Sequence, residues 1–141
     1  MNENSAQRAS NYALMSAFYQ KQNQIDSAQA YLNKAKTIDP SNPNYLIQEG
    51  SMYSAVGNYD AAFGAYSKAE AMNPNSLELC EAQTNMMFKQ MKEKYGTTNS
   101  QELKNKMNTD EKNRLCSVLK RAKGLGLSDM NKDLFIAMVC K

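Results

Sequence analysis

The fold of this chain is decided by residues 43–76, which read PNYLIQEGSMYSAVGNYDAAFGAYSKAEAMNPNS. Apolar side chains recur at helical spacing over about 43–56 and again over about 60–72. Asn42 is a favourable N-cap in front of the first segment, and Gly57 ends it as a C-terminal glycine does. An Asn-Pro pair stops the second segment. The stretch therefore predicts two helices joined by a short turn.

Small residues inside these segments predict that the two helices pack closely together. Gly50 lies inside the first segment, where a glycine costs about 1 kcal/mol relative to alanine and so needs a structural reason. Ala62 is the small residue of the second segment. We expect Gly50 and Ala62 to form a hole, with rings from Tyr53, Tyr59 and Tyr66 as the knobs.

The same pattern occurs once more, immediately before this stretch in the chain. The two copies align without a gap, so residues 9–42 and 43–76 form an internal repeat. Aligned positions that carry identical residues in both copies include Tyr19 and Tyr53, Asp26 and Asp60, Ala28 and Ala62, Ala35 and Ala69, and Pro40 and Pro74.

This period and residue set resemble the tetratricopeptide repeat, whose pattern is W-x2-L-G-x2-Y, then A-x3-F, then P. The copy at 43–76 departs from it at Glu49, which stands in the leucine slot, and the earlier copy has Met15 and Ser16 in the L-G slots. The matching residues of the copy at 43–76 are Leu46, Gly50, Tyr53, Ala62, Tyr66 and Pro74.

The resemblance implies an all-α fold, a tetratricopeptide-like array of α-α hairpins (a right-handed α-solenoid) with about seven helices. Residues 77–110 begin as a third repeat and then diverge, because Thr84 replaces the small glycine. Residues 110–141 are expected to be capping helices, since each hairpin of such an array buries its face only against a neighbour. We expect 1–141 to form a single domain, with repeats at 9–42 and 43–76.

The composition argues against an enzyme. The chain contains no histidine, which excludes Ser-His-Asp and Cys-His catalysis and histidine metal sites. No glycine-rich phosphate loop is present, and we expect no cofactor and no metal. The one basic cluster, at 120–123, lacks interleaved aromatic residues, so it favours a solvated helix end over nucleic-acid binding.

The three cysteines leave two interpretations open. Cys80, Cys116 and Cys140 are odd in number and lack CxxC spacing, which argues against a disulfide framework and a zinc site. Buried, inert thiols are the simpler interpretation. A Cys116–Cys140 bridge in an oxidising compartment is the alternative.

The sequence predicts no membrane insertion, since no apolar run approaches the length that a membrane-spanning helix needs. The polar N-terminus lacks an apolar signal core. We expect a cytoplasmic protein, or a periplasmic or cell-envelope one if the chain was excised from a longer secreted or anchored parent.

The resemblance also implies where a partner binds. In tetratricopeptide proteins the first helix of each hairpin lines a concave groove that takes a peptide. This face is mostly small and uncharged here, so it predicts an apolar peptide whose backbone amides pair with Gln48 and Asn85. The alternative is a face that is merely solvated, or filled by the protein's own C-terminus. The candidate groove residues are Ala13, Leu14, Ala17, Lys21, Asn44, Ile47, Gln48, Ser51, Ser54, Glu81, Asn85, Phe88 and Lys89.

A basic clamp for acidic C-terminal peptides, which some members of the family use, is not expected. Such a clamp needs several cationic donors on the groove face. The equivalent places carry no cation and one acid: Ala13, Ala17, Gln48, Glu78 and Ala82.

The leading hypothesis is thus a non-catalytic scaffold that binds a protein or peptide partner in the groove. The runner-up is a structural subunit or domain that docks or forms a homodimer through its apolar C-terminal helix. The candidate assembly surface comprises Met130, Leu134, Phe135 and Met138.

Overall fold

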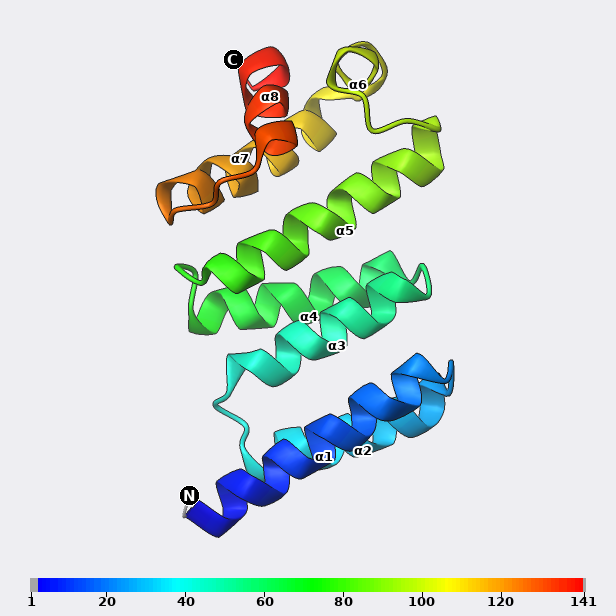
Figure 1. Ribbon diagram of the computed structural model, residues 1–141, viewed down its shortest axis with the longest axis vertical. Helices are drawn as coiled ribbons and strands as arrows, with labels where there is room; N and C mark the ends of the chain where they lie inside the picture. The colour runs from blue at the N-terminus through cyan, green and yellow to red at the C-terminus, as the bar shows by residue number, and fades with distance from the viewer. Residues whose placement is uncertain (1–2, 141) are drawn as a thin grey trace. The chain divides into compact units, whose positions relative to one another are not determined.

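A computed structural model describes residues 3–140, and this part of the chain consists of helices joined by short connections, with no strand (Figure 1). The predicted all-α, tetratricopeptide-like array is confirmed. The described range forms eight helices rather than about seven, because residues Ser100–Lys106 fold into a short additional helix after the fifth one. They are α1 (Glu3–Lys21), α2 (Ile25–Ile38), α3 (Pro43–Ala55), α4 (Tyr59–Met72), α5 (Leu77–Tyr95), α6 (Ser100–Lys106), α7 (Thr109–Gly124) and α8 (Met130–Val139).

The chain divides into two compact units. Unit 1, Met1–Asn73, contains α1 to α4, and unit 2, Pro74–Lys141, contains α5 to α8. The single domain expected over 1–141 stays a prediction.

Unit 1 consists of two helical hairpins that follow the two predicted repeats. α1 packs along α2, and α3 packs along α4 (Figure 1). Asn42 caps α3 as expected: its side-chain oxygen accepts a hydrogen bond from the Asn44 backbone N–H at 3.0 Å. The proline at 43 occupies the first helical turn, where its missing N–H leaves no intrahelical bond unmade. Asn58 caps α4 in the same way.

The second hairpin closes around Gly50. The ring of Tyr66, which is fully buried, lies where a side chain at Gly50 would stand: a Cβ there would be 2.6 Å from its Cδ1. The expected hole is thus filled by Tyr66, while Tyr53 and Tyr59 are half-buried.

In the first hairpin, a serine occupies the position of this close helix contact. Ser16 takes the place of Gly50, is 1% exposed, and donates a hydrogen bond to the Ala28 carbonyl oxygen at 2.7 Å. Its hydroxyl is therefore satisfied inside the helix contact, which is what a buried polar group requires. Leu32 stands where the second hairpin has Tyr66, and it is also fully buried.

Unit 2 is built on α5 and α7. α5 packs against α7, while α8 packs against both α6 and α7. Arg121 of α7 reaches α5, donating from Nη2 to Gln83 Oε1 at 3.1 Å and from Nε to Cys80 Sγ at 3.3 Å. Lys123 forms an ion pair with Asp133 at 2.8 Å. Two cations of the 120–123 cluster are therefore engaged in internal contacts.

Glu111 ties the start of α7 to the end of α5. Its carboxylate accepts from Lys94 Nζ at 2.8 Å and from Tyr95 Oη at 2.6 Å, and it closes a capping box with Asn108. Partial burial raises the pKa of Glu111, but the hydrogen bonds from Lys94, Tyr95 and Asn108 together outweigh it, so the pKa lies below its usual value.

A disulfide fastens the last helix of unit 2. Cys116 of α7 and Cys140 at the end of α8 are bonded, with their Cα atoms 5.5 Å apart, while Cys80 is a buried thiol. The interpretation of three inert thiols is therefore wrong for Cys116 and Cys140. The sequence leaves the bridge as an alternative because only the packing of α8 on α7 brings the two side chains together.

Replacement of Gly50 tests the helix contact of the second hairpin. We expect Gly50→Ala to lower the free energy of unfolding by about 2 kcal/mol, because the new methyl group overlaps the Tyr66 ring. Gly64→Ala is the matched control, since a Cβ there meets no atom within 4 Å. It should stabilise by up to about 1 kcal/mol through helix propensity. Urea unfolding measures the free energy of unfolding of both variants. Changes of the same sign and size in the two variants would contradict the close contact between Gly50 and Tyr66.

Thiol counting tests the disulfide. Denatured, unreduced protein should expose one reactive thiol to Ellman's reagent, from Cys80, whereas reduction should raise the count to three. Cys116→Ser should cost roughly 3 kcal/mol of stability under oxidising conditions and little under reducing conditions, because the bridge restricts the unfolded chain. Three thiols in protein purified without reductant from an oxidising compartment would exclude the bridge.

Candidate peptide-binding surface

The first helices of the two hairpins of unit 1, α1 and α3, are joined by a direct polar contact. Gln48 Nε2 donates to the Ala13 carbonyl oxygen at 2.9 Å. Ala13 and Ile47 are both buried, and Ala13 belongs to a core cluster with Leu32. These two candidates for the groove are therefore not available to a ligand.

A second group of candidates in unit 1 is open to solvent. Leu14, Lys21, Asn44 and Ser51 are exposed, and Ala17 is partly exposed. Lys21 carries the only formal charge among them, so this surface is small, largely uncharged and accessible.

Ser51 is positioned by the residue that fills the second hairpin. Its Oγ lies 3.1 Å from the Tyr66 hydroxyl, in a hydrogen bond that either group can donate. Burial raises the pKa of Tyr66, and the hydrogen bond with Ser51 partly offsets this rise. Ser54, one turn further along α3, is buried and must be removed from the candidate surface.

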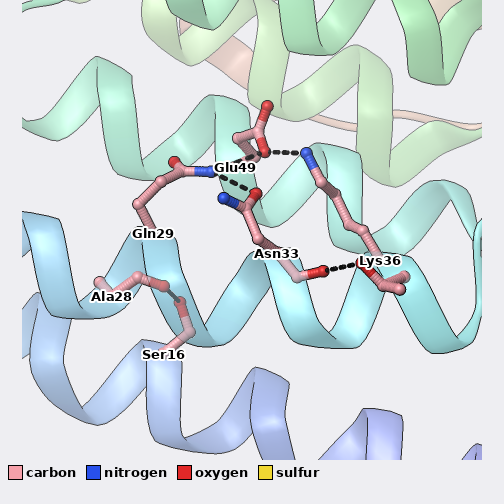
Figure 2. A network of polar contacts seen from close by, with 7 residues as sticks. Ser16, Ala28, Gln29, Asn33, Lys36 and Glu49 are labelled. Carbon is pink, nitrogen blue, oxygen red and sulfur yellow. Dashed lines mark hydrogen bonds and ion pairs between the residues drawn. The ribbon is translucent and has the colours of Figure 1, made fainter.

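A polar network around Glu49 joins the two hairpins (Figure 2). Glu49 of α3 is buried and forms an ion pair with Lys36 of α2. Gln29 of α2 also donates to Glu49 Oε2, at 3.3 Å, and to Asn33 Oδ1, at 2.8 Å. Sequence reasoning identified Glu49 as a departure from the repeat pattern but missed its partners. The presence of Lys36 on the preceding helix could have predicted this ion pair.

Two of the four candidates on α5, in unit 2, contact the last helix of the same unit. Asn85 Oδ1 accepts a hydrogen bond from Lys132 Nζ of α8 at 2.9 Å. Phe88 packs edge-on against Phe135 of α8, with ring centroids 5.2 Å apart. Glu81 and Lys89 are partly buried. Within unit 2, α8 therefore lies over the part of α5 that carries Asn85 and Phe88.

The candidate assembly surface on α8 is split by this packing. Met130 is 86% exposed and Leu134 is also exposed, whereas Met138 is half-buried. Phe135 is fully buried against α5, so its ring cannot meet a partner. The apolar character of α8 that the sequence displays is thus partly explained by the core of unit 2.

The described residues, 3–140, show no group of three or more histidine, cysteine, aspartate or glutamate side chains placed to hold a metal ion. None of the helices in that range has the length and apolar content needed to cross a membrane.

Comparison with protein families matches a tetratricopeptide repeat model to residues 9–42, the first of the two repeats identified in the sequence. Comparison with curated proteins gave no match. Tetratricopeptide repeats form protein–protein interaction scaffolds and are typically non-catalytic.

The ion pair between the hairpins makes a testable prediction. Lys36→Met should destabilise the protein by about 2 kcal/mol, because it leaves the mostly buried Glu49 carboxylate without its counter-charge. The double variant Lys36→Met/Glu49→Leu should lie within about 1 kcal/mol of the wild type, since an apolar pair often replaces a buried ion pair without loss. A double-mutant cycle measured by urea unfolding gives the coupling free energy between Lys36 and Glu49. If the free-energy changes of the two single variants simply add up in the double variant, the two side chains are not in direct contact.

Proposed function

We propose that this tetratricopeptide-repeat protein is an interaction scaffold that binds a peptide segment of a partner protein on the exposed face of α1 and α3 in unit 1. The observation that carries the proposal is the set of accessible, mostly small side chains on two first helices that are fixed to each other by Gln48 and Ala13. A rigid, pre-formed surface lowers the entropy that a peptide loses on binding.

The chemistry of this surface favours an apolar peptide. Leu14 offers apolar contact, Ala17 leaves room for a ligand side chain, and Asn44 and Ser51 offer polar groups at the edge. Lys21 is a single cation, whereas a clamp for a carboxylate terminus needs several convergent donors. The ligand is therefore a largely apolar segment rather than an acidic tail.

The packing of unit 2 supports placing the ligand on unit 1. Asn85 and Phe88 already contact Lys132 and Phe135 of α8, so a peptide that used both side chains would have to compete with these contacts. The disulfide at Cys140 opposes displacement of α8, because it holds the end of α8 to α7.

The alternative, a structural role in a larger assembly, is favoured by one feature of α8. Met130 and Leu134 are exposed large apolar residues four positions apart, which places them on the same side of the helix. An assembly contact through α8 would use these two residues and not Phe135.

The disulfide is also informative about the cellular compartment of the protein. Disulfides persist in oxidising environments and are rare in the reducing cytosol. The Cys116–Cys140 bridge therefore supports the alternative location, a periplasmic or cell-envelope compartment, over the cytoplasm.

The test is an affinity capture from the source organism with three baits. Ala17→Arg/Ser51→Arg places two bulky cations on the proposed surface, at equivalent positions of the two repeats. Met130→Arg/Leu134→Arg is the matched control on α8. We expect the wild type and the α8 variant to retain the same partner and the α1–α3 variant to lose it, with affinity for the purified partner reduced roughly 10- to 100-fold in calorimetry.

Two results would decide against this placement. Retention of the partner by Ala17→Arg/Ser51→Arg, with its helical circular dichroism intact, would remove the ligand from unit 1. Loss of the partner by Met130→Arg/Leu134→Arg alone would establish the assembly role instead.

A further inference from the structure

The Cys116–Cys140 disulfide lies in the wall of a small pocket of unit 2. The pocket has a volume of about 380 Å³ and is formed by α7 and the end of α8. Clefts of this size hold small molecules. It is called the disulfide pocket, and its lining residues are Thr109, Lys112, Asn113, Cys116, Ser117, Lys120, Val139 and Cys140.

The two cysteines of the bridge differ in exposure. Cys140 is partly exposed, whereas Cys116 is buried, with 8% of its surface exposed. A disulfide is broken when a thiolate attacks one of its sulfur atoms, and access to that atom limits the rate. Cys140 is therefore the cysteine that a thiol in the pocket reaches more readily.

Two lysines flank Cys116 on α7. Lys112 precedes it by four residues and Lys120 follows it by four, so the three side chains lie on one side of the helix, a turn apart. Both lysines line the disulfide pocket, and its described lining residues include no acid. Neither lysine forms an ion pair with a residue of the range 3–140. The pocket thus places two positive charges beside a disulfide.

These charges select among the thiols that enter the pocket. A cleft lined by charges of one sign raises the local concentration of solutes of the opposite sign. A thiolate that also carries a carboxylate has one negative charge on the attacking sulfur and a second that can contact a lysine. The pocket therefore favours small anionic thiols over neutral and cationic ones.

The lysines also favour one direction of exchange. Attack on Cys140 Sγ forms a bond between this atom and the incoming sulfur, breaks the Cys116–Cys140 bond, and leaves the electron pair on Cys116 Sγ. The departing thiolate then stands between Lys112 and Lys120, and nearby cations stabilise a thiolate. A second thiol that attacks the mixed disulfide completes the reduction: two thiols become one disulfide, and the bridge becomes two cysteine thiols.

We propose that the Cys116–Cys140 bridge is a thiol–disulfide exchange site for small thiols that carry an additional anionic group. The thiol attacks Cys140, its anionic group contacts Lys112 or Lys120, and Cys116 leaves as the thiolate. The bridge is thus reactive as well as structural. The site belongs to unit 2 and shares no residue with the peptide surface proposed on unit 1.

The experiment compares rate constants for reduction of the full chain by mercaptoacetate, 2-mercaptoethanol and cysteamine, which are anionic, neutral and cationic thiols. Each rate constant is expressed per thiolate and measured at low ionic strength. In Lys112→Glu/Lys120→Glu, the ratio of the mercaptoacetate to the 2-mercaptoethanol rate constant should fall about 10-fold relative to the wild type, because the carboxylate now meets two acids. The corresponding ratio for cysteamine should rise.

Two further variants make the comparison specific to the pocket. Lys92→Glu/Lys104→Glu changes the net charge equally at exposed residues of unit 2 that do not line the pocket, so its ratios should stay within about twofold of the wild type. Lys112→Arg/Lys120→Arg keeps both charges and should keep the wild-type ratios. A ratio taken within one variant is insensitive to a change in stability, because the same opening of the structure affects all three thiols.

The site of attack is tested by trapping the mixed disulfide. Wild-type protein treated with limiting mercaptoacetate would be capped with N-ethylmaleimide at mildly acidic pH and mapped by mass spectrometry. We expect mercaptoacetate on Cys140 and maleimide on Cys116.

Four results would overturn the proposal. They are no reduction of the folded wild type, unchanged ratios in Lys112→Glu/Lys120→Glu, an equal change of the ratios in Lys92→Glu/Lys104→Glu, and mercaptoacetate chiefly on Cys116. None of these results involves the peptide partner, so this proposal can fail while the proposed function stands.

Discussion

The close approach of α3 and α4 at Gly50 is the constraint on which the rest of unit 1 depends. The Tyr66 ring occupies the space that any other residue at Gly50 would fill, and its hydroxyl reaches Ser51. One contact therefore fixes the spacing of the hairpin and the orientation of the exposed face of α3. In the first hairpin, the Ser16 hydroxyl occupies the equivalent position and donates a hydrogen bond to the Ala28 carbonyl oxygen.

The two units use the faces of their first helices differently. In unit 1, α1 and α3 keep Leu14, Asn44 and Ser51 open to solvent. In unit 2, α8 lies on Asn85 and Phe88 of α5, and the disulfide secures its end. A repeat array must cover its last hairpin, and α8 supplies part of that cover within unit 2. We infer that unit 1 is the part left to partners.

Periodicity was sufficient to predict the helices of unit 1, because helical spacing and the internal repeat depend on residues that are close in sequence. The Gly50–Tyr66 contact could be predicted for the same reason: a glycine inside a helix needs a bulky neighbour to justify it.

The groove candidates were harder to predict. Ala13 and Ile47 lie in helix contacts rather than on an open surface, because whether a helical position is covered depends on how the helices turn against each other. Contacts between distant segments could not be predicted from local patterns either. Lys36 and Glu49 lie on different hairpins, so no helical spacing links them, and Cys116 meets Cys140 only because α8 turns back onto α7.

The most direct test of where this scaffold binds is an amide chemical-shift map. The protein, labelled with nitrogen-15, would be titrated with the peptide segment of its captured partner. Binding on unit 1 predicts the largest shifts at Ala17, Asn44 and Ser51, with Asn85 and Phe88 unchanged and the Lys132 contact intact. The largest shifts at Asn85, Phe88 and α8, with unit 1 unchanged, would show that the ligand displaces α8 and would contradict the placement on α1 and α3.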